Sequence, residues 1–215
     1  MLPEGGPVAV KVCGLTTPED AAACAGHGPW GIGVVFARES VRRVDAATAA
    51  EVLAAVPVGV ARVGVFVGTS AAEMARVARR AGLTHLQIDA DDDPRAAREA
   101  AGLPVIQGFG VRDAGSLERA RASQADLVLL DAAVAGRHGG TGVSFDWSLI
   151  EGGVLGRPFA LAGGLRPDNV AEAARRLRPV LVDVSSGVES APGRKDPERV
   201  RAFVAAVAGA SPVAA

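Results

Sequence analysis

The sequence predicts an α/β fold, a closed (β/α)8 TIM barrel, from three observations. Eight short apolar runs alternate with alanine-rich stretches along most of the 215 residues. The runs are almost continuously apolar, which is typical of parallel strands covered on both faces. Eight strand–helix units in a chain of this length favour a closed barrel over an open sheet. We therefore expect one barrel domain over residues 1–208 and a frayed tail at 209–215.

The expected strands are the short apolar runs that are rich in β-branched residues. They cover residues 8–13, 30–36, 60–67, 84–89, 104–109, 126–131, 158–162 and 180–185. A doubly wound open sheet is the alternative architecture. It requires several glycines after the first strand and a ribose-binding acid about 20 residues further on. The first turn, Cys13-Gly14-Leu15-Thr16, has a single glycine, which favours the barrel.

Capping residues mark where the intervening helices begin and end. A hydrogen-bonding side chain followed by proline is typical of a helix start, and it occurs at Thr17-Pro18, Asp93-Pro94 and Asp196-Pro197. Ser70 and Glu73 match the capping-box pattern. Glycine follows two helical stretches, as a C-terminal cap does: Gly82 after 74–81 and Gly102 after 95–101.

The composition narrows the possible function classes. The formal charge is −1, so no basic surface indicates nucleic acid or an anionic membrane as a partner. No stretch approaches the ~20 apolar residues of a membrane helix, and the N-terminus lacks a signal-peptide pattern. Cys13 and Cys24 do not make a disulfide framework, and the three histidines lack metal-ligand spacing. We expect a cytoplasmic protein, monomeric or homodimeric, without a metal site.

Two strand ends carry candidate catalytic groups, because the carboxyl ends of barrel strands form the active face. Cys13 ends the first strand, and a thiolate is a competent general base when its neighbours lower its pKa. Plain burial of a small residue is the alternative role. Asp131 ends the sixth strand, where an acid is costly to bury without a partner or a task; a cap or salt bridge is its alternative. Together they would suit a proton-transfer isomerisation.

Two loops on the same face predict a phosphate site. Gly163-Gly164 follows the seventh strand, and Ser185-Ser186-Gly187 follows the eighth. Paired glycines let the backbone approach a ligand closely, and the serine turn offers N–H groups and hydroxyls. Loops after strands seven and eight hold phosphate in many barrels. Ordinary turn chemistry is the alternative, but the two adjacent loops favour a small phosphorylated substrate.

Three further segments on this face are less specific. The long glycine-containing loop after Asp131 is expected to be a flap over the mouth or a surface loop, with Asp146 capping a short helix that Trp147 anchors. The charge run at 38–44 contains arginines suited to clamping a carboxylate, although a solvated charge run is the alternative. The segment 189–196 predicts no chemistry by itself.

Taken together, these motifs resemble the phosphoribosylanthranilate isomerase family of tryptophan biosynthesis. The matching segments run in the family's order from residue 8 to about 208, and as a set they are specific. They are residues 11–16, 36–43, 62–67, 129–131, 139–142, 145–147, 163–165 and 182–189, with Gly193, Lys195 and Asp196.

The resemblance implies a cofactor-free Amadori rearrangement of a phosphoribosyl amine of anthranilate, from aldose to ketose. It implies that Asp131 is the general acid at the ring oxygen and Cys13 the general base at C2. Arg42, rather than Arg43, is implied to contact the anthranilate side, and Asp183 the sugar hydroxyls. The implied phosphate site consists of Gly163, Gly164, Ser186 and Gly187.

Two departures from the family pattern stand near the expected mouth. Asp89 replaces a usual histidine and Gln107 a frequent lysine, so we expect a less cationic mouth. One alternative is the related histidine-pathway isomerase, or a barrel serving both pathways, but Cys13 at the strand end and the acids at 91–93 disfavour a second phosphate site. A metal-dependent sugar-phosphate epimerase is disfavoured, because this sequence lacks the histidine ligands that such an enzyme needs. A non-catalytic phosphate-metabolite binding barrel would not need both Cys13 and Asp131.

Overall fold

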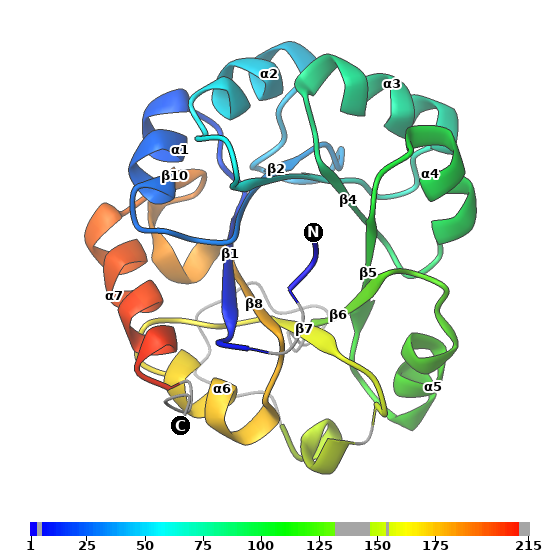
Figure 1. The fold of residues 1–215 in the computed structure, drawn as a ribbon, viewed down its shortest axis with the longest axis vertical. Coiled ribbons are helices and arrows are strands. Elements are labelled where there is room, and N and C mark those ends of the chain that lie inside the picture. The colour runs from blue at the N-terminus through cyan, green and yellow to red at the C-terminus, as the bar shows by residue number, and fades with distance from the viewer. Residues whose placement is uncertain (4–5, 132–146, 154, 211–215) are drawn as a thin grey trace.

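The predicted barrel is confirmed. A computed structural model describes residues 1–3, 6–131, 147–153 and 155–210. Eight parallel strands follow one another around a closed barrel in chain order, and helices surround it (Figure 1). The last strand, β8 (Leu181–Val184), pairs with the first, β1 (Ala9–Cys13), which closes the sheet.

All eight expected strands form, and all except β3, which ends two residues early, lie within one residue of the expected bounds at each end. The other six are β2 (Gly31–Val35), β3 (Ala61–Val65), β4 (His85–Ile88), β5 (Val105–Gly110), β6 (Leu127–Asp131) and β7 (Phe159–Ala162). A short antiparallel hairpin follows β8 and lies outside the barrel. It consists of β9 (Glu189–Ala191) and β10 (Arg194–Lys195).

Seven α-helices lie in the described part of the chain, and none of them has the length and apolar character to cross a bilayer. They are α1 (Pro18–Ala25), α2 (Ala46–Ala54), α3 (Ala71–Ala81), α4 (Pro94–Ala101), α5 (Ala114–Ala122), α6 (Val170–Leu177) and α7 (Pro197–Ala208). Helix α7 lies beside α1 and so completes the ring (Figure 1). Of the expected tail, residues 211–215 lie outside the described residues.

The predicted caps are confirmed with one exception. The side chains of Thr17, Asp93 and Asp196 accept hydrogen bonds from the first turns of α1, α4 and α7. Ser70 accepts from the Glu73 N–H, but the Glu73 carboxylate pairs with Arg76 on the exposed face of α3. Only half of the expected capping box therefore forms. Gly82 and Gly102 adopt the left-handed conformation that ends α3 and α4.

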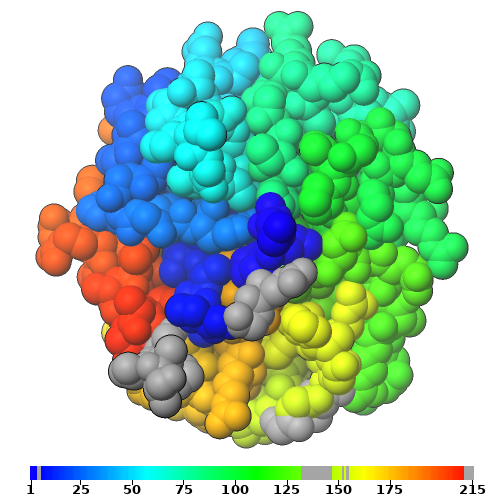
Figure 2. All heavy atoms as spheres, viewed as in Figure 1, coloured from blue at the N-terminus to red at the C-terminus, as the bar shows by residue number. Residues whose placement is uncertain are grey.

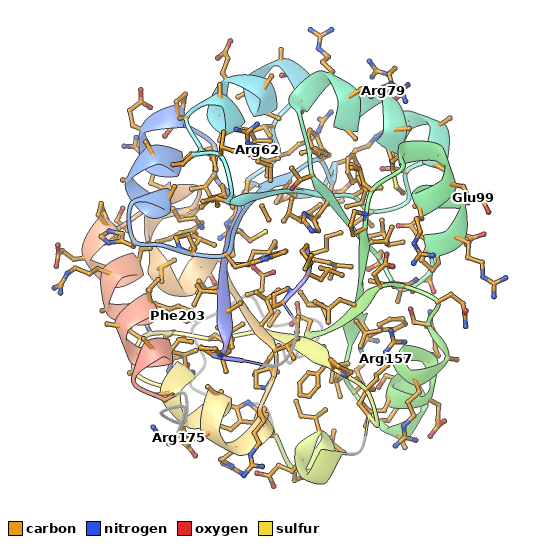
Figure 3. The ribbon with its side chains drawn as sticks, viewed as in Figure 1. Arg62, Arg79, Glu99, Arg157, Arg175 and Phe203 are labelled. Atoms are coloured by element: carbon orange, nitrogen blue, oxygen red, sulfur yellow. The ribbon has the colours of Figure 1, made fainter. Side chains whose placement is uncertain are left out.

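Two apolar cores lie on opposite faces of the strands. A small cluster fills the barrel interior: Ala61, Val63, Ile106, Leu127, Leu129, Ala160, Ala162 and Leu181. The larger cluster lies between the strands and the helices and includes Phe203, which points inward from α7 (Figure 3). Charged side chains on the helices, such as Arg79, Glu99 and Arg175, point away from the barrel. Strand alternation therefore decides which polar residues face the interior.

The amino-terminal segment covers the end of the barrel where the strands begin. The Trp30 indole donates to the Met1 carbonyl at 3.1 Å, and its ring meets His85 edge-on at 5.1 Å. Leu2 packs against the interior cluster beside Trp30. Figure 2 shows the first residues over the middle of this face. The opposite end, where the strands finish, therefore carries the candidate site.

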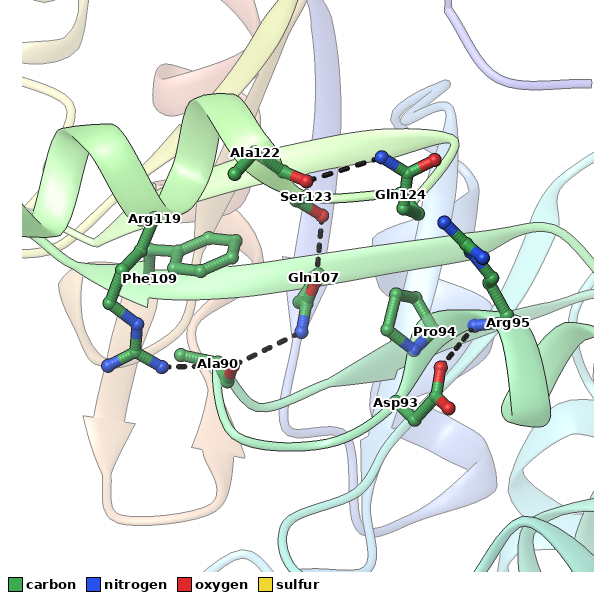
Figure 4. Close-up of a pocket in the computed structure, with 10 residues that line it drawn as sticks. All are labelled: Ala90, Asp93, Pro94, Arg95, Gln107, Phe109, Arg119, Ala122, Ser123 and Gln124. Carbon is green, nitrogen blue, oxygen red and sulfur yellow. Dashed lines mark hydrogen bonds between the residues drawn. The ribbon is translucent and has the colours of Figure 1, made fainter.

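The expectation that Gln107 lies at the mouth is wrong. Its neighbour Ile106 faces the interior, so Gln107 points outward between α4 and α5, where it lines a groove of about 300 Å³ (Figure 4). Its amide nitrogen donates to the carbonyls of residues 89, 90 and 92 at 2.9–3.3 Å, and its oxygen accepts from Ser123 Oγ at 2.6 Å. Gln107 therefore stabilises the loop after β4 and leaves the charge of the mouth unchanged. Asp89, the other departure, is exposed directly after β4.

We predict that Gln107→Ala lowers the free energy of unfolding by roughly 2–4 kcal/mol, because it removes four part-buried hydrogen bonds between the loop after β4, β5 and Ser123. Urea denaturation followed by circular dichroism measures this change. Gln124→Ala is the matched control: Gln124 lines the same groove but is exposed, so we expect a loss below ~0.5 kcal/mol. Equal losses in the two variants would contradict the assigned role of Gln107.

Candidate active site

The thiol of Cys13 lies inside the barrel at the end of β1. Cys13 is 7% exposed. Gly33 on the neighbouring β2 leaves room for it: a β-carbon there would stand 2.9 Å from the Cys13 sulfur and 3.2 Å from Nζ of Lys11. The thiol and the amine therefore share the space that this glycine leaves open. Burial raises the pKa of Cys13, although the positive charge of Lys11 acts to lower it.

Lys11 and Asp183 form a buried ion pair beneath Cys13. Lys11 Nζ lies 2.8 Å from Asp183 Oδ2, and the Lys11 side chain is fully buried. Burial alone lowers the pKa of Lys11, but Asp183 and Cys13 raise it by more, so the amine is protonated. The second carboxylate oxygen, Asp183 Oδ1, is buried and has no hydrogen-bond partner among the described residues. This oxygen can accept a hydrogen bond from a substrate hydroxyl.

Arg42, from the loop after β2, lies over the end of β1. A β-carbon on Gly14 would stand 2.5 Å from Arg42 Cδ, and Gly14 has a left-handed φ of +80°. Arg42 Nε and Nη2 each donate to one carboxylate oxygen of Glu189 at 2.7 Å. Its neighbour Arg43 is exposed, in agreement with the preference for Arg42. The bidentate pair holds the guanidinium plane in one orientation.

The β9–β10 hairpin supplies the groups that hold Arg42, and the sequence motifs did not reveal this role. Lys195 Nζ donates to Glu189 Oε1 at 2.9 Å and to the Ser185 carbonyl at 3.1 Å. Burial alone raises the pKa of Glu189, but hydrogen bonds from Arg42 and Lys195 lower it to about 2. The sequence did contain one signal of this role: Glu189 and Lys195 carry opposite charges, stand six residues apart and directly follow the candidate phosphate loop.

The four residues of the expected phosphate site lie on two loops that touch. Gly163 and Gly164, after β7, have φ values of +93° and +62°. After β8, Gly187 passes so close to Leu165 that a β-carbon would stand 1.9 Å from the Leu165 carbonyl oxygen. Only glycine fits there, and it brings Ser186 beside the Gly163-Gly164 turn. The two loops therefore meet, with Gly164 and Ser186 exposed and Gly163 and Gly187 partly exposed, and their glycines let a ligand approach the backbone closely.

A side-chain amide braces the first of these loops. Asn169, at the start of α6, donates to the Gly164 carbonyl at 3.0 Å and accepts from the Arg166 N–H at 2.7 Å. Both bonds hold the turn that follows Gly163. A fixed turn keeps its N–H groups in place before a ligand arrives, which lowers the entropic cost of binding.

Asp131 ends β6 on the inward face of that strand. Its register partners are Gly110 on β5 and Ala162 on β7, and it alternates with Leu127 and Leu129, which pack inside the barrel. Asp131 is partly exposed, as the rim of the mouth requires. Asp131 and Cys13 thus occupy inward positions at the ends of two separated strands.

The loop that follows Asp131 was expected to form a flap with Asp146 as a cap. These predictions concern residues 132–146, which lie outside the described residues. The predicted anchor is confirmed: Trp147 packs on the core, and the Arg176 guanidinium lies 5.2 Å from the centre of its ring.

Comparisons with known proteins agree with this geometry. The family model for N-(5'-phosphoribosyl)anthranilate isomerase matches residues 10–206. The chain belongs to this family. The resemblance drawn from the motifs is therefore confirmed, and with it the assignment as an isomerase.

Three relatives match this phosphoribosylanthranilate isomerase family member over nearly its whole length. The isomerase of Rubrobacter xylanophilus is 48% identical over 200 residues, which are 92% of this chain and 97% of the relative. The crystal structure of the Thermotoga maritima enzyme matches with a TM-score of 0.85 at 36% identity, over 94% of this chain and 99% of the other. A family structure in complex with reduced 1-(o-carboxyphenylamino)-1-deoxyribulose 5-phosphate matches with a TM-score of 0.80 at 34% identity, with the same coverage.

We predict that Glu189→Gln flattens the loss of stability in acid. The folded pKa of Glu189, about 2, lies below its ordinary value of 4.5. The carboxylate therefore adds stability that is fully present above pH 4.5 and is lost as the pH falls towards 2. With solvent screening allowed for, this contribution in wild type is roughly 1–2 kcal/mol.

Urea denaturation across this pH range measures the contribution. Glu198→Gln, at an exposed glutamate paired with Arg201, is the matched control and should keep the wild-type slope. A Glu189→Gln protein that still loses stability as steeply as wild type would contradict the assigned pairing.

Proposed function

We propose that this family member catalyses the Amadori rearrangement of N-(5'-phosphoribosyl)anthranilate to 1-(2-carboxyphenylamino)-1-deoxyribulose 5-phosphate in tryptophan biosynthesis. The observation that carries this proposal is the arrangement of one barrel end. An inward thiol on β1, an inward carboxyl group on β6 and the glycine-containing loops after β7 and β8 stand at the same end of the barrel. We expect a cytoplasmic monomer or homodimer that uses no metal or cofactor.

Cys13 and Asp131 are the proposed proton-transfer groups. Asp131 donates a proton to the ring oxygen as the furanose opens, which gives a Schiff base. The thiolate of Cys13 then removes the proton from C2, and the resulting enolamine tautomerises to the ketone. A base and an acid on separate strands can act on two positions of one sugar without exchanging a proton directly.

The proposed binding groups hold the two ends of the substrate apart. Gly163, Gly164, Ser186 and Gly187 bind the phosphate through backbone N–H groups and the serine hydroxyl. Asp183 Oδ1 accepts from a sugar hydroxyl. Arg42 has an edge left for the anthranilate carboxylate, because Nη1 has no hydrogen-bond partner among the described residues while Nε and Nη2 are held by Glu189. A charge-assisted hydrogen bond from a fixed guanidinium favours this anionic ring substituent.

We predict that Cys13→Ser and Asp131→Asn each reduce turnover at least ~100-fold, the lower range for losing a general acid or base. Anthranilate is fluorescent, so its phosphoribosyl adduct can be generated in situ and its disappearance followed with each protein. Cys24→Ala is the matched control. Cys24 lies on the buried face of α1, so this variant should leave turnover unchanged.

Two outcomes of this assay would refute parts of the proposal. Wild-type turnover in both Cys13→Ser and Asp131→Asn would refute the mechanism. Saturable binding of the adduct without conversion by the wild-type protein would instead indicate a non-catalytic binding barrel.

A further inference from the structure

Lys11 is a buried cation that the proposed proton transfers do not use. Its side chain is fully buried, yet it lies between two groups of the proposed site, Asp183 and Cys13. Taking an ammonium group and a carboxylate out of water is expensive, and a buried ion pair is often no more stabilising than packed apolar residues. A pair in this position therefore calls for an explanation beyond stability.

The geometry gives the Lys11 amine two neighbours. Nζ is 2.8 Å from Asp183 Oδ2, and it meets the Cys13 sulfur in the space above Gly33, where a β-carbon would approach both. Lys11 and Asp183 are also direct register partners across the β1–β8 pairing. The register therefore places Lys11 opposite Asp183, and the ion pair holds the buried amine on the side of the barrel where the Cys13 sulfur lies.

We propose that Lys11 is the positioning residue that stabilises the Cys13 thiolate, and that Asp183 controls how much of the Lys11 charge acts on the sulfur. This inference rests on the proposed function, in which Cys13 is the base. It assigns Asp183 a second task beside its contact with the sugar. Substrate binding and activation of the base are then coupled through one carboxylate.

The charges that face Cys13 come from four segments of the chain. Lys11 on β1 and Lys195 on the hairpin lower the pKa of the thiol, and Asp183 on β8 raises it. Arg42, from the loop after β2, also interacts with Cys13. Burial has the largest effect, so the pKa of Cys13 is raised above its ordinary value and the free protein holds a thiol at neutral pH.

The unpartnered oxygen of Asp183 explains how this balance shifts on binding. Asp183 Oδ1 is buried and has no hydrogen-bond partner among the described residues. A sugar hydroxyl that donates to Oδ1 draws negative charge away from the Lys11 side of the carboxylate. More of the ammonium charge then acts on the sulfur, and the thiolate forms next to the C2 proton that it removes.

The experiment is a pH titration of the Cys13 thiolate in the full-length protein, followed by its ultraviolet absorbance, with Cys13→Ser subtracted. The pKa of Cys24 is about 11, and a Cys24→Ala background removes its signal. Lys11→Met is expected to raise the Cys13 midpoint by at least about one pH unit, and Asp183→Asn to lower it by a similar amount. Arg43→Met, an exposed cation in the loop that carries Arg42, should leave the midpoint unchanged.

The opposite directions distinguish this proposal from a merely structural pair. If Lys11 only neutralises Asp183, breaking the pair from either side loosens the same contact, and the two midpoints move together or stay in place. Either result would overturn the proposal. Should Lys11→Met fail to fold, Lys11→Met/Asp183→Asn removes both charges. Its midpoint is expected above wild type, because the lysine has the larger effect, and a midpoint at or below wild type would overturn the proposal.

The titration needs no substrate, so it is independent of the turnover assay. Opposite shifts would support the control of the Cys13 pKa by Lys11 and Asp183 even if Cys13→Ser retained full turnover, a result that would refute Cys13 as the base. In the turnover assay, Lys11→Met is expected to move the acidic limb of the pH–activity profile, where activity rises as the thiolate forms, upward in pH together with the thiol midpoint. A uniform loss of activity at every pH would point to a structural role.

Discussion

The closure of the barrel between its first and last strands is the constraint on which the site depends. β8 pairs with β1, and this register sets Lys11 directly opposite Asp183. The ion pair therefore lies across the join between the two ends of the chain, fully buried at the base of the mouth. A shift of β1 by one residue against β8 would turn Lys11 into the apolar layer under the helices and leave Asp183 facing the interior, so neither charge would keep its partner. The strand pairing that closes the barrel is thus also the pairing that brings Lys11 and Asp183 together at the site.

Other parts of the site are built outward from this join. Cys13 follows Lys11 by two residues on β1, and Gly33 on β2 leaves the space for both side chains. Above them, Arg42 covers Gly14 and is held by Glu189 from the hairpin after β8. Each contact joins segments that are far apart in the sequence but adjacent in the barrel. The loops around the mouth are consequently held by charge pairs and close backbone contacts as well as by the apolar core.

Much of the fold could be predicted from the sequence because its signals are local. Apolar runs marked the eight strands, and hydrogen-bonding caps marked helix starts such as those at Thr17 and Asp196. Cys13 and Asp131 are predicted as site residues from their place at strand ends. That prediction requires only that the carboxyl ends of all barrel strands lie on one face.

The remaining features depend on contacts that no local pattern encodes. The pairing of Arg42 with Glu189 joins residues 147 positions apart. The resemblance implied that Gln107 replaces a family lysine near the mouth, yet its alternation with Ile106 turns it towards the helices. Lys11 lies within an otherwise apolar strand, and no sequence motif predicts a role for it. The period of two along β1 and β8 places Lys11 and Asp183 on the inward face.

The most direct test of the central claim is a crystal structure of this protein with reduced 1-(o-carboxyphenylamino)-1-deoxyribulose 5-phosphate, the compound bound in one of the matching family structures. The account predicts the phosphate against the turns at Gly163-Gly164 and Ser186-Gly187. It also predicts the Cys13 sulfur and the Asp131 carboxylate on either side of the sugar, each within hydrogen-bond reach. A phosphate bound elsewhere, or a sulfur turned away from the sugar carbons, would contradict it.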